Sequence, residues 1–208
     1  DAPLLTDHQG IMKHILNRLN IDDMLVTKGV VDALDHSSPK FAVGGKLGLD
    51  CTGDEITELG IILLKDNELL ERMKAITSEV KDLKQYFTDT KNPIAVISVE
   101  KTRNQKYLFE DLKPLFEHIK ILIIVENNKN DVNNSYMLVW RVANNIDSNR
   151  DLFIDGHTMC LDATNKNAFD NFNRRWPDDV DCSKEVIESL RERKIIDVSD
   201  EFINKFYL

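Results

Sequence analysis

Cysteine, positive charge and long hydrophobic runs are all scarce in this sequence. The three cysteines, Cys51, Cys160 and Cys182, form no CxxC pair, so neither a disulfide framework nor a zinc site is indicated. No HExxH motif is present, and we expect no metal site in this chain. The formal net charge is -9, with basic residues interleaved among acids, which argues against a nucleic-acid or anionic membrane surface.

The longest apolar run, Ile121 to Val125, is far too short to span a bilayer. The sparse cysteines favour a reducing compartment. We therefore expect a cytoplasmic protein with no nucleic-acid partner and no membrane span.

Hydrophobic periodicity predicts an α/β fold in which a mostly parallel sheet is flanked by helices. Pro93 to Val99 and Ile121 to Val125 are continuous apolar runs rich in β-branched residues, typical of strands buried on both faces. A helix over Leu108 to Ile119 joins them, and Pro114 is expected to kink or end it. Spacing also predicts helices over 9–20, 134–145 and from Ser183, short buried strands over 24–27 and 152–154, and one long amphipathic helix over 66–87.

Two segments resemble each other and indicate an internal duplication of a helix-strand-LDxT unit. Asn17 to Gly29 aligns without a gap with Asn144 to Gly156, at an offset of 127 residues. The LDCT at Leu49 then matches the LDAT at Leu161 at an offset of 112, so the first copy carries an insert of 15 residues. Because Asp and Thr recur at equivalent places, a structural turn or cap is favoured for them over catalysis.

The duplication suggests one compact domain built from related parts. We expect residues 1–60 to form a first repeat unit, 61–91 a connecting amphipathic helix, and 92–208 a second α/β unit with a C-terminal helix. A strand-like run precedes the second copy, whereas none precedes the first helix. Together with a first residue that is Asp and not Met, this predicts the C-terminal fragment of a longer protein.

The insert of the first copy concentrates glycines around a lysine. Gly44, Gly45 and Lys46 are the residue types that hold a phosphate through backbone N–H groups and a positive charge. However, the Walker pattern fails at Lys40 and at Leu47. The other interpretation is a tight loop whose glycines need a positive φ, followed by a solvated lysine.

The same insert contains Asp35, His36, Ser37 and Ser38, the residue types of a hydrolase. Neighbours in sequence point in different directions, so a turn is favoured in which Asp and Ser side chains bond the backbone before Pro39. Hydrolysis by His36 and Ser38 remains the weaker hypothesis.

Taken together, LDHSSPKFAVGGKLGLDCT at Leu34 to Thr52 and the preceding ILNRLNIDDMLVTKG resemble the C-terminal region of the UbiD-like decarboxylases. That family carries an LD-x-x-SP element followed by G-G/S-K-x-G-x-D-A-T. The similarity is specific over 11–52 and weaker over 121–166, where Thr158 replaces the family's lysine and Cys160 its glycine. The tandem arrangement resembles the longer members grouped with quinone biosynthesis.

The resemblance implies non-oxidative, reversible decarboxylation of an aromatic or α,β-unsaturated acid. The full-length enzyme is expected to use prenylated flavin mononucleotide with a divalent metal and potassium. The family's flavin-binding domain and its catalytic Glu-Arg-Glu network lie upstream, so this chain is expected to hold no catalytic residue and, in isolation, no cofactor. The upstream flavin-binding domain of the same polypeptide is the expected partner, and a homo-oligomer the expected assembly.

The resemblance also implies roles for residues of the insert. Gly45 and Lys46 are the candidate contacts to the cofactor phosphate or to the cleft. The candidate cleft-loop residues, which shape the domain that closes toward the active site, are Asp35, His36, Ser37, Ser38, Pro39, Gly48, Asp50 and Thr52. The alternative function is a free-standing α/β module that binds a phosphorylated small ligand through the Gly44-Gly45-Lys46 loop.

Overall fold

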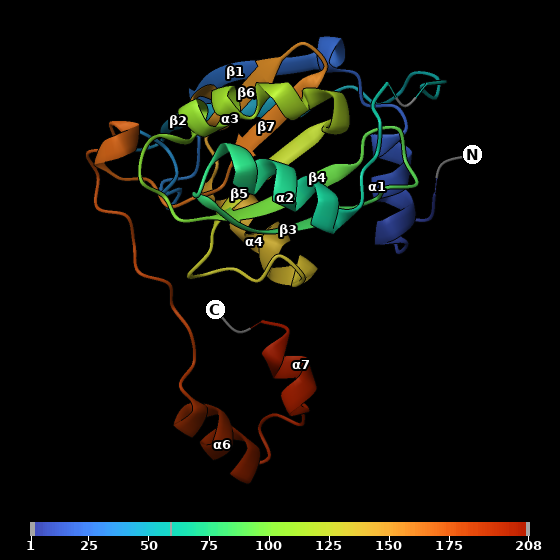
Figure 1. Ribbon diagram of the computed structural model, residues 1–208. Helices are drawn as coiled ribbons and strands as arrows, with labels where there is room; N and C mark the ends of the chain where they lie inside the picture. The colour runs from blue at the N-terminus through green and yellow to red at the C-terminus, as the bar shows by residue number, and fades with distance from the viewer. Residues whose placement is uncertain (1–2, 59, 207–208) are drawn as a thin grey trace.

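A five-stranded sheet with the strand order β3-β4-β5-β7-β6 forms the centre of the computed structural model, which describes residues 3–58 and 60–206 (Figure 1). Strands β4, β5 and β7 are parallel, and β3 and β6 add antiparallel edges. A separate two-stranded sheet, β1-β2, lies beside it. The predicted α/β fold with a mostly parallel sheet is thereby confirmed.

The strands are β1 (Met24–Val30), β2 (Val43–Leu49), β3 (Val80–Tyr86), β4 (Ile94–Val99), β5 (Ile121–Glu126), β6 (Leu152–Asp155) and β7 (Thr158–Asp162). The α-helices are α1 (His8–Leu16), α2 (Asp66–Ile76), α3 (Gln105–Asp111), α4 (Ser135–Asn145), α5 (Ser148–Asp151), α6 (Lys184–Glu192) and α7 (Asp200–Asn204). Three short 3₁₀ helices complete the described elements: η1 (Ile21–Asp23), η2 (Lys113–His118) and η3 (Ala168–Asp170).

Helices cover both faces of the central sheet because its strands alternate apolar side chains between the two faces. On one face, α2 and α3 pack against Ile97 of β4 and Leu122 of β5. On the other face, α4 packs against Val96 of β4, and α1 packs against Ile121 and Met159. This burial on both sides explains why β4 and β5 appear in the sequence as unbroken apolar runs.

Several predicted boundaries are confirmed. The helix expected over 108–119 is divided into α3 and η2, and Pro114 stands in the first turn of η2, where its missing N–H costs nothing. Asn134 and Ser183 cap the N-termini of α4 and α6 through their side-chain oxygens. The first helix ends at Leu16, before the expected boundary at residue 20.

The long helix predicted over 66–87 is wrong in its second half. α2 ends at Ile76, and Val80 to Tyr86 form β3, the antiparallel edge of the sheet. A register shift between Val80 and Asp82 brings Val80 and Leu83 to the same buried face although they are three residues apart. Because of the bulge, buried apolar residues in this strand are three positions apart, as they are in a helix, and the prediction therefore assigned a helix.

The strand predicted over 24–27 exists, but it is not buried. It extends to Val30 as β1, pairs with β2, and leaves Leu25 64% exposed and Val30 76% exposed. Apolar side chains that indicate a buried strand in the sequence thus face solvent in the described structure.

The two copies of the duplicated unit have the same local structure. Each contains a helix, a helical turn and an antiparallel strand pair, β1-β2 in the first copy and β6-β7 in the second. The Thr52 hydroxyl donates to Asp50 Oδ1 over 2.7 Å, and the Thr164 hydroxyl donates to Asp162 Oδ1 over 2.6 Å. Both Asp-x-Thr elements are therefore turns, as the recurrence predicted. The insert forms the long loop between β1 and β2, whereas β6 and β7 are joined by a tight turn.

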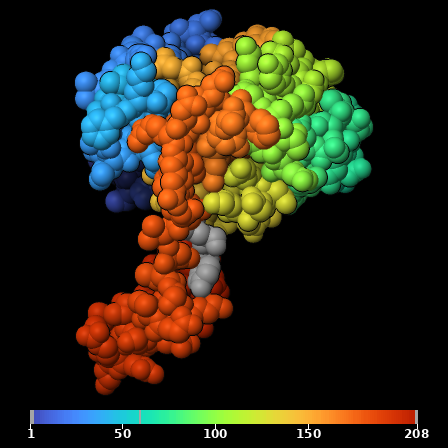
Figure 2. Space-filling model, turned by 90° about the vertical axis from the view of Figure 1, so that its left-hand side faces the viewer, coloured from blue at the N-terminus to red at the C-terminus, as the bar shows by residue number. Residues whose placement is uncertain are grey.

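After η3 the chain leaves the body as an arm, which we define as residues 175–206. Figure 2 shows it projecting away from the rest of the molecule, and Figure 1 shows α6 at its far end and α7 running back toward the body. Asp179 fastens the arm to the body, because Arg141 of α4 donates to its carboxylate over 2.9 Å and Lys129 over 3.1 Å. α6 has no buried residue. None of the described helices is long and apolar enough to cross a membrane.

Candidate functional site

The loop between β1 and β2 contains the predicted cleft residues, and hydrogen bonds from its own side chains hold it in shape. The Ser37 hydroxyl donates to Asp35 Oδ1 over 2.7 Å, and the Ser37 backbone N–H reaches the same oxygen over 2.8 Å. The Ser38 hydroxyl donates to the carbonyl of Lys40 over 2.9 Å. This is the turn that the sequence predicted, with Asp and Ser side chains bonding the backbone ahead of Pro39.

The same geometry argues against a hydrolase. Ser37 and Ser38 are 3% and 0% exposed, and both hydroxyls are occupied as donors. The His36 ring lies edge-on against Trp176, with ring centroids 4.8 Å apart, and no hydrogen bond joins it to either serine among the described residues. Neither serine is placed as a nucleophile with His36 as its base.

The glycines of β2 allow the hairpin to lie directly on α5. The Gly45 N–H donates to Asp147 Oδ2 over 2.7 Å. A Cβ at Gly45 would lie 2.6 Å from Ser148 Oγ, and a Cβ at Gly44 would lie 2.8 Å from Asp147 Oδ2. Neither glycine has a positive φ, so the expected tight loop is wrong: both are strand residues needed for close approach.

The geometry of β2 does not fit a phosphate cradle. The N–H group of Gly45 is occupied by the Asp147 carboxylate, whose negative charge would repel a phosphate. Lys46 is exposed beside it, and Gly48, near the end of β2, is exposed as well. Gly45, one of the two residues offered as contacts to a cofactor phosphate, therefore docks the hairpin onto α5.

A network of buried charges, which sequence analysis missed, connects this loop to the central sheet. Lys166 has a fully buried side chain, and its Nζ lies 2.9 Å from Asp162 Oδ2 and 3.4 Å from Asp151 Oδ1. Arg150 holds Asp151 with two hydrogen bonds of 2.7 Å. Arg150 Nη1 also donates to the carbonyl of Ser37 over 2.9 Å. The loop is thus tied through paired charges to the end of β7.

The network continues to the other side of Asp162 through Lys101. Lys101 donates to Thr164 Oγ1 over 2.8 Å and to Asp170 Oδ2 over 2.6 Å, and the Thr164 hydroxyl donates to Asp162. Burying charges in this way is tolerable only when every member is paired. The nearest sequence signal was the LDATNK segment, in which Lys166 follows Asp162 by four residues.

Burial and neighbouring positive charges shift the pKa values of the carboxyl groups in this network in opposite directions. Burial tends to raise the pKa of Asp162, but Lys166, Lys101 and the Thr164 hydrogen bond outweigh it and hold the pKa below its ordinary value. Burial raises the pKa of Asp151, against the charges of Lys166 and Arg150. With its positive charges paired, the network is suited to holding the fold, and it leaves no free acid or base among its members.

A polar hollow of about 340 Å³ lies beside this network, at the carboxyl ends of β4 and β5. Lys101 and Glu126 line it, together with Val99, Glu100, Asn127 and Asn128. Burial raises the pKa of Glu126, against the charge of Lys101. Carboxyl ends of parallel strands are where α/β sheets bind ligands, so this is the best-placed polar hollow in the central sheet.

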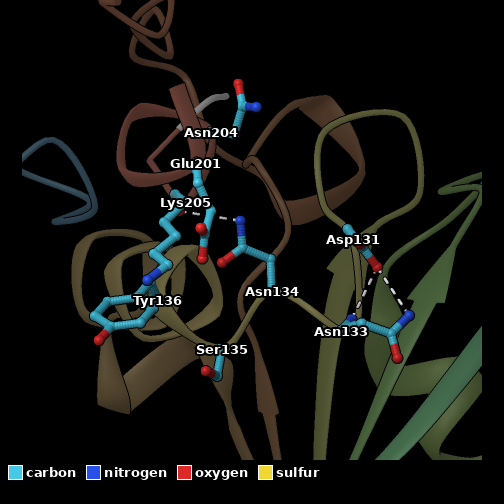
Figure 3. Close-up of a pocket in the computed structure, with 8 residues that line it drawn as sticks. All are labelled: Asp131, Asn133, Asn134, Ser135, Tyr136, Glu201, Asn204 and Lys205. Carbon is cyan, nitrogen blue, oxygen red and sulfur yellow. Dashed lines mark hydrogen bonds between the residues drawn. The ribbon is translucent and has the colours of Figure 1, made fainter. Parts of the chain in front are cut away.

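A second hollow, of about 370 Å³, lies where the arm meets the body (Figure 3). α7 contributes Glu201 and Asn204, and the start of α4 contributes Asn134 and Tyr136. The Asn134 side-chain amide donates to the carbonyl of Lys205 over 3.1 Å, and the arm is thereby held here by a single described hydrogen bond. The remaining lining residues are Asp131, Asn133, Ser135 and Lys205.

The resemblance implies a flavin and metals for the full-length enzyme, and in this chain only a contact of Gly45 and Lys46 to the cofactor phosphate. No group of three or more His, Cys, Asp or Glu residues within 3–58 and 60–206 is arranged to hold a metal ion. The backbone N–H of Gly45, which is one of the predicted phosphate contacts, donates to Asp147 and is not free to bind a phosphate.

Comparison with known proteins agrees with the resemblance seen in the sequence. The family described as the 3-octaprenyl-4-hydroxybenzoate carboxy-lyase C-terminal domain matches residues 1–51 and 61–187. Two uncharacterized proteins of Helicobacter pylori, from strains J99 and 26695, are 44% and 43% identical over 211 residues. These alignments cover 100% of this chain and 34% of each relative, so the chain spans about a third of their length.

Solved structures with a similar fold include the UbiD-class enzyme HmfF of Pelotomaculum thermopropionicum, in an evolved dimeric form in complex with prFMN. It has 23% identity and a TM-score of 0.43, over 54% of this chain and 26% of that one. The vanillic acid decarboxylase of Sedimentibacter hydroxybenzoicus in closed form has 19% identity and a TM-score of 0.47, over 61% of this chain and 30% of that one. Because the family match covers most of its residues, the chain belongs to the 3-octaprenyl-4-hydroxybenzoate carboxy-lyase C-terminal domain family, and is a UbiD-like C-terminal domain.

Proposed function

We propose that this chain is the assembly and cleft-closing domain of a UbiD-like carboxy-lyase whose reaction centre lies elsewhere in a longer polypeptide. The reaction would be the non-oxidative decarboxylation of an aromatic or α,β-unsaturated acid, as part of quinone biosynthesis. The full-length enzyme would use prenylated flavin mononucleotide, with a divalent metal and potassium. The observation that carries the proposal is the family match over residues 1–51 and 61–187.

The structure supports a role in assembly in two ways. The first hairpin and its loop present exposed apolar side chains, including Leu25, Val30, Leu34 and Phe41, which are 64–88% exposed. Apolar surface of this kind marks contact with another protein surface. The upstream flavin-binding domain of the same polypeptide is the partner that we propose for it.

The arm supports the formation of a homo-oligomer. α6 carries its apolar side chains on one side and buries none of them, and Val186 is 48% exposed. Figure 2 shows that the arm extends well away from the body, which places α6 within reach of a neighbouring molecule. We propose that a second copy of the polypeptide covers this helix.

The experiment that tests the proposal compares two polypeptides loaded with prenylated flavin. The full-length protein should release CO₂ from members of a panel of aromatic and unsaturated acids that includes 4-hydroxybenzoate. The 208-residue chain alone should release none. Turnover by the 208-residue chain, or failure of the flavin-loaded full-length protein on the whole panel, would contradict the proposal.

The cleft-closing part of the proposal has a separate test in the full-length enzyme. Phe41 is 71% exposed on the loop, so Phe41→Ser should leave stability unchanged and lower kcat/KM if the loop closes over the substrate. Ile62, which is 61% exposed between the hairpin and α2, offers Ile62→Ser as a matched control. Equal kcat/KM in the two variants would rule out closure by this loop.

The alternative module that binds a phosphorylated ligand has weaker support, because Asp147 occupies the Gly45 N–H. Lys46→Ala tests it directly. Phosphate affinity that falls on this substitution would favour the alternative, and unchanged affinity would exclude the Gly44-Gly45-Lys46 loop.

A further inference from the structure

The outer edge of β2 carries no strand in the described part of the chain. β2 pairs with β1, and its other described bridge joins Val43 to Lys40 within the loop. The Asp50 N–H donates to the carbonyl of Asp23, so the backbone groups of even-numbered residues of β2 face β1. Those of Leu47 and Leu49 must therefore point away from β1, since backbone groups alternate along a strand. Within residues 3–58 and 60–206, no backbone hydrogen bond joins Leu47 or Leu49 to another segment.

In the second copy of the duplicated unit, the equivalent edge pairs with a parallel strand. At the offset of 112 residues, Leu47 corresponds to Met159 and Leu49 to Leu161 in β7. The outer edge of β7 is filled by β5, which runs parallel to it and pairs Ile121 with Met159. The Met159 N–H donates to the carbonyl of Lys120 over 2.9 Å. The equivalent donor in β2 is Leu47.

The residues at the outer edge are more buried in the second copy, where β5 pairs with β7, than in the first copy, where no strand pairs with this edge among the described residues. Met159 is 5% exposed and Leu161 is 8% exposed in the second copy. Their counterparts are more accessible, and Leu49 is 43% exposed. A two-stranded antiparallel pair is marginally stable without a further strand or a covering element, and an open apolar edge invites pairing.

We propose that the outer edge of β2, from Leu47 to Cys51, binds a parallel β-strand supplied by the segment of the longer polypeptide that leads into α1. β5 leads into α4, and α4 corresponds to α1, so the duplication places the missing strand at this point of the chain. The curated relatives leave ample length for it, since this chain covers 34% of them. The proposal is independent of the carboxy-lyase activity.

The start of the pairing is fixed by α5. Asp147 accepts the outward N–H of Gly45, so a new strand finds its first free donor at Leu47. The equivalent position in the second copy, Met159, is where pairing with β5 begins. The expected register therefore matches that of β5 on β7.

The first test is amide hydrogen exchange in the full-length polypeptide, resolved to single residues by mass spectrometry. Val26 supplies the internal reference, because Val26 lies on the outer edge of β1 and its counterpart in β6 belongs to an edge strand. We expect the Leu47 and Leu49 amides to exchange roughly tenfold or more slowly than the Val26 amide. This protection should be the same in a dilution series.

Equal exchange at Leu47, Leu49 and Val26 would overturn the proposal. Protection that appears only as the concentration rises would also overturn it, because the strand would then belong to a second copy.

The second test uses a matched pair of proline variants in the full-length polypeptide. Leu49 and Val26 are 43% and 39% exposed, and the N–H of each points away from its hairpin partner. Leu49→Pro removes a donor to the proposed strand, whereas Val26→Pro removes a donor to solvent. We expect Leu49→Pro to lower the melting temperature and to speed exchange at Leu47, with a much smaller effect of Val26→Pro. Equal effects would overturn the proposal, and if Leu49→Pro fails to fold, exchange in the wild-type protein decides.

Discussion

Replacing Lys166 by methionine tests whether the buried charge network holds the fold together. Methionine keeps most of the side-chain volume but removes the charge that lies 2.9 Å from Asp162 and 3.4 Å from Asp151. Asp151 keeps its two hydrogen bonds from Arg150, whereas Asp162, which is 1% exposed, loses the one ion pair that it makes with the described residues. Removing one partner of a buried pair costs about 3–5 kcal/mol.

For a chain of this length, that loss corresponds to a fall in melting temperature of about 6–20 °C. Urea unfolding followed by circular dichroism measures the free energy directly, provided that the transition is two-state. The control is Lys113→Met, because Lys113 pairs with Asp155 at the surface, where both side chains are about half exposed. We expect little change in the control, since exposed ion pairs contribute little.

The effect of Lys166→Met should depend on pH in a direction that follows from the sign of the shifts. In the wild type the pKa of Asp162 is lowered, so its contribution to stability is present above the ordinary Asp pKa and is lost as pH falls. Without Lys166, burial raises the pKa of Asp162, and the protonated carboxyl is then favoured in the folded protein. The variant should therefore recover stability relative to wild type as pH falls from about 7 to about 5.

Two results would refute this reasoning. One is a loss of less than about 1 kcal/mol at neutral pH, because an uncompensated buried carboxylate costs more than that. The other is the same loss at both pH values, which would mean that the lost packing of the lysine stem accounts for the effect.

Three further predictions concern β2, the polar hollow and the arm. Gly45→Ala should destabilise the chain by about 1–3 kcal/mol in urea unfolding because its Cβ would clash with α5, whereas Gly48→Ala, with its nearest neighbour at 3.8 Å, should be tolerated. Because the pKa of Glu126 is raised in the folded protein, the wild type should lose stability as pH rises through that pKa. Glu126→Gln cannot ionise and should not show this loss, which urea midpoints across that pH range measure. Asp179→Asn should weaken the contact between Arg141 and the arm, so the arm should be cleaved faster in limited proteolysis.

Each of these predictions has a result that would contradict it. Equal stability of the two alanine variants would mean that β2 moves away from α5 without cost. Parallel pH profiles of wild type and Glu126→Gln would show that this carboxyl titrates normally. Unchanged cleavage of Asp179→Asn would show that other contacts anchor the arm.

The parallel strands β4 and β5 could be predicted from the sequence because both are buried on both faces, whereas β7, the third parallel strand, was not among the expected strands. The run from Ile121 to Val125 offers no other secondary structure of that length, and the helices beside it begin at side chains such as Asn134 that cap them. The local signal and the tertiary environment agree in these segments.

The predictions failed where tertiary contacts change the meaning of a local pattern. Val80 and Leu83 have helical spacing, but a bulge in β3 produces the same spacing. Gly44 and Gly45 suggested a turn, whereas their function is to let a strand approach α5, which is more than 100 residues away in the sequence. Lys166 looks like an ordinary surface charge in the sequence until the fold brings Asp151 to it.

The difference between the two hairpins shows where this scaffold tolerates extra length. The first hairpin carries a long loop between its strands, while the second turns at Gly156 and His157, which are exposed. Lengthening a surface loop costs only about 0.6 kcal/mol for each doubling. The turn at Gly156 is therefore a suitable position to graft an epitope or a reporter peptide, because the related hairpin already carries an insertion at the corresponding point.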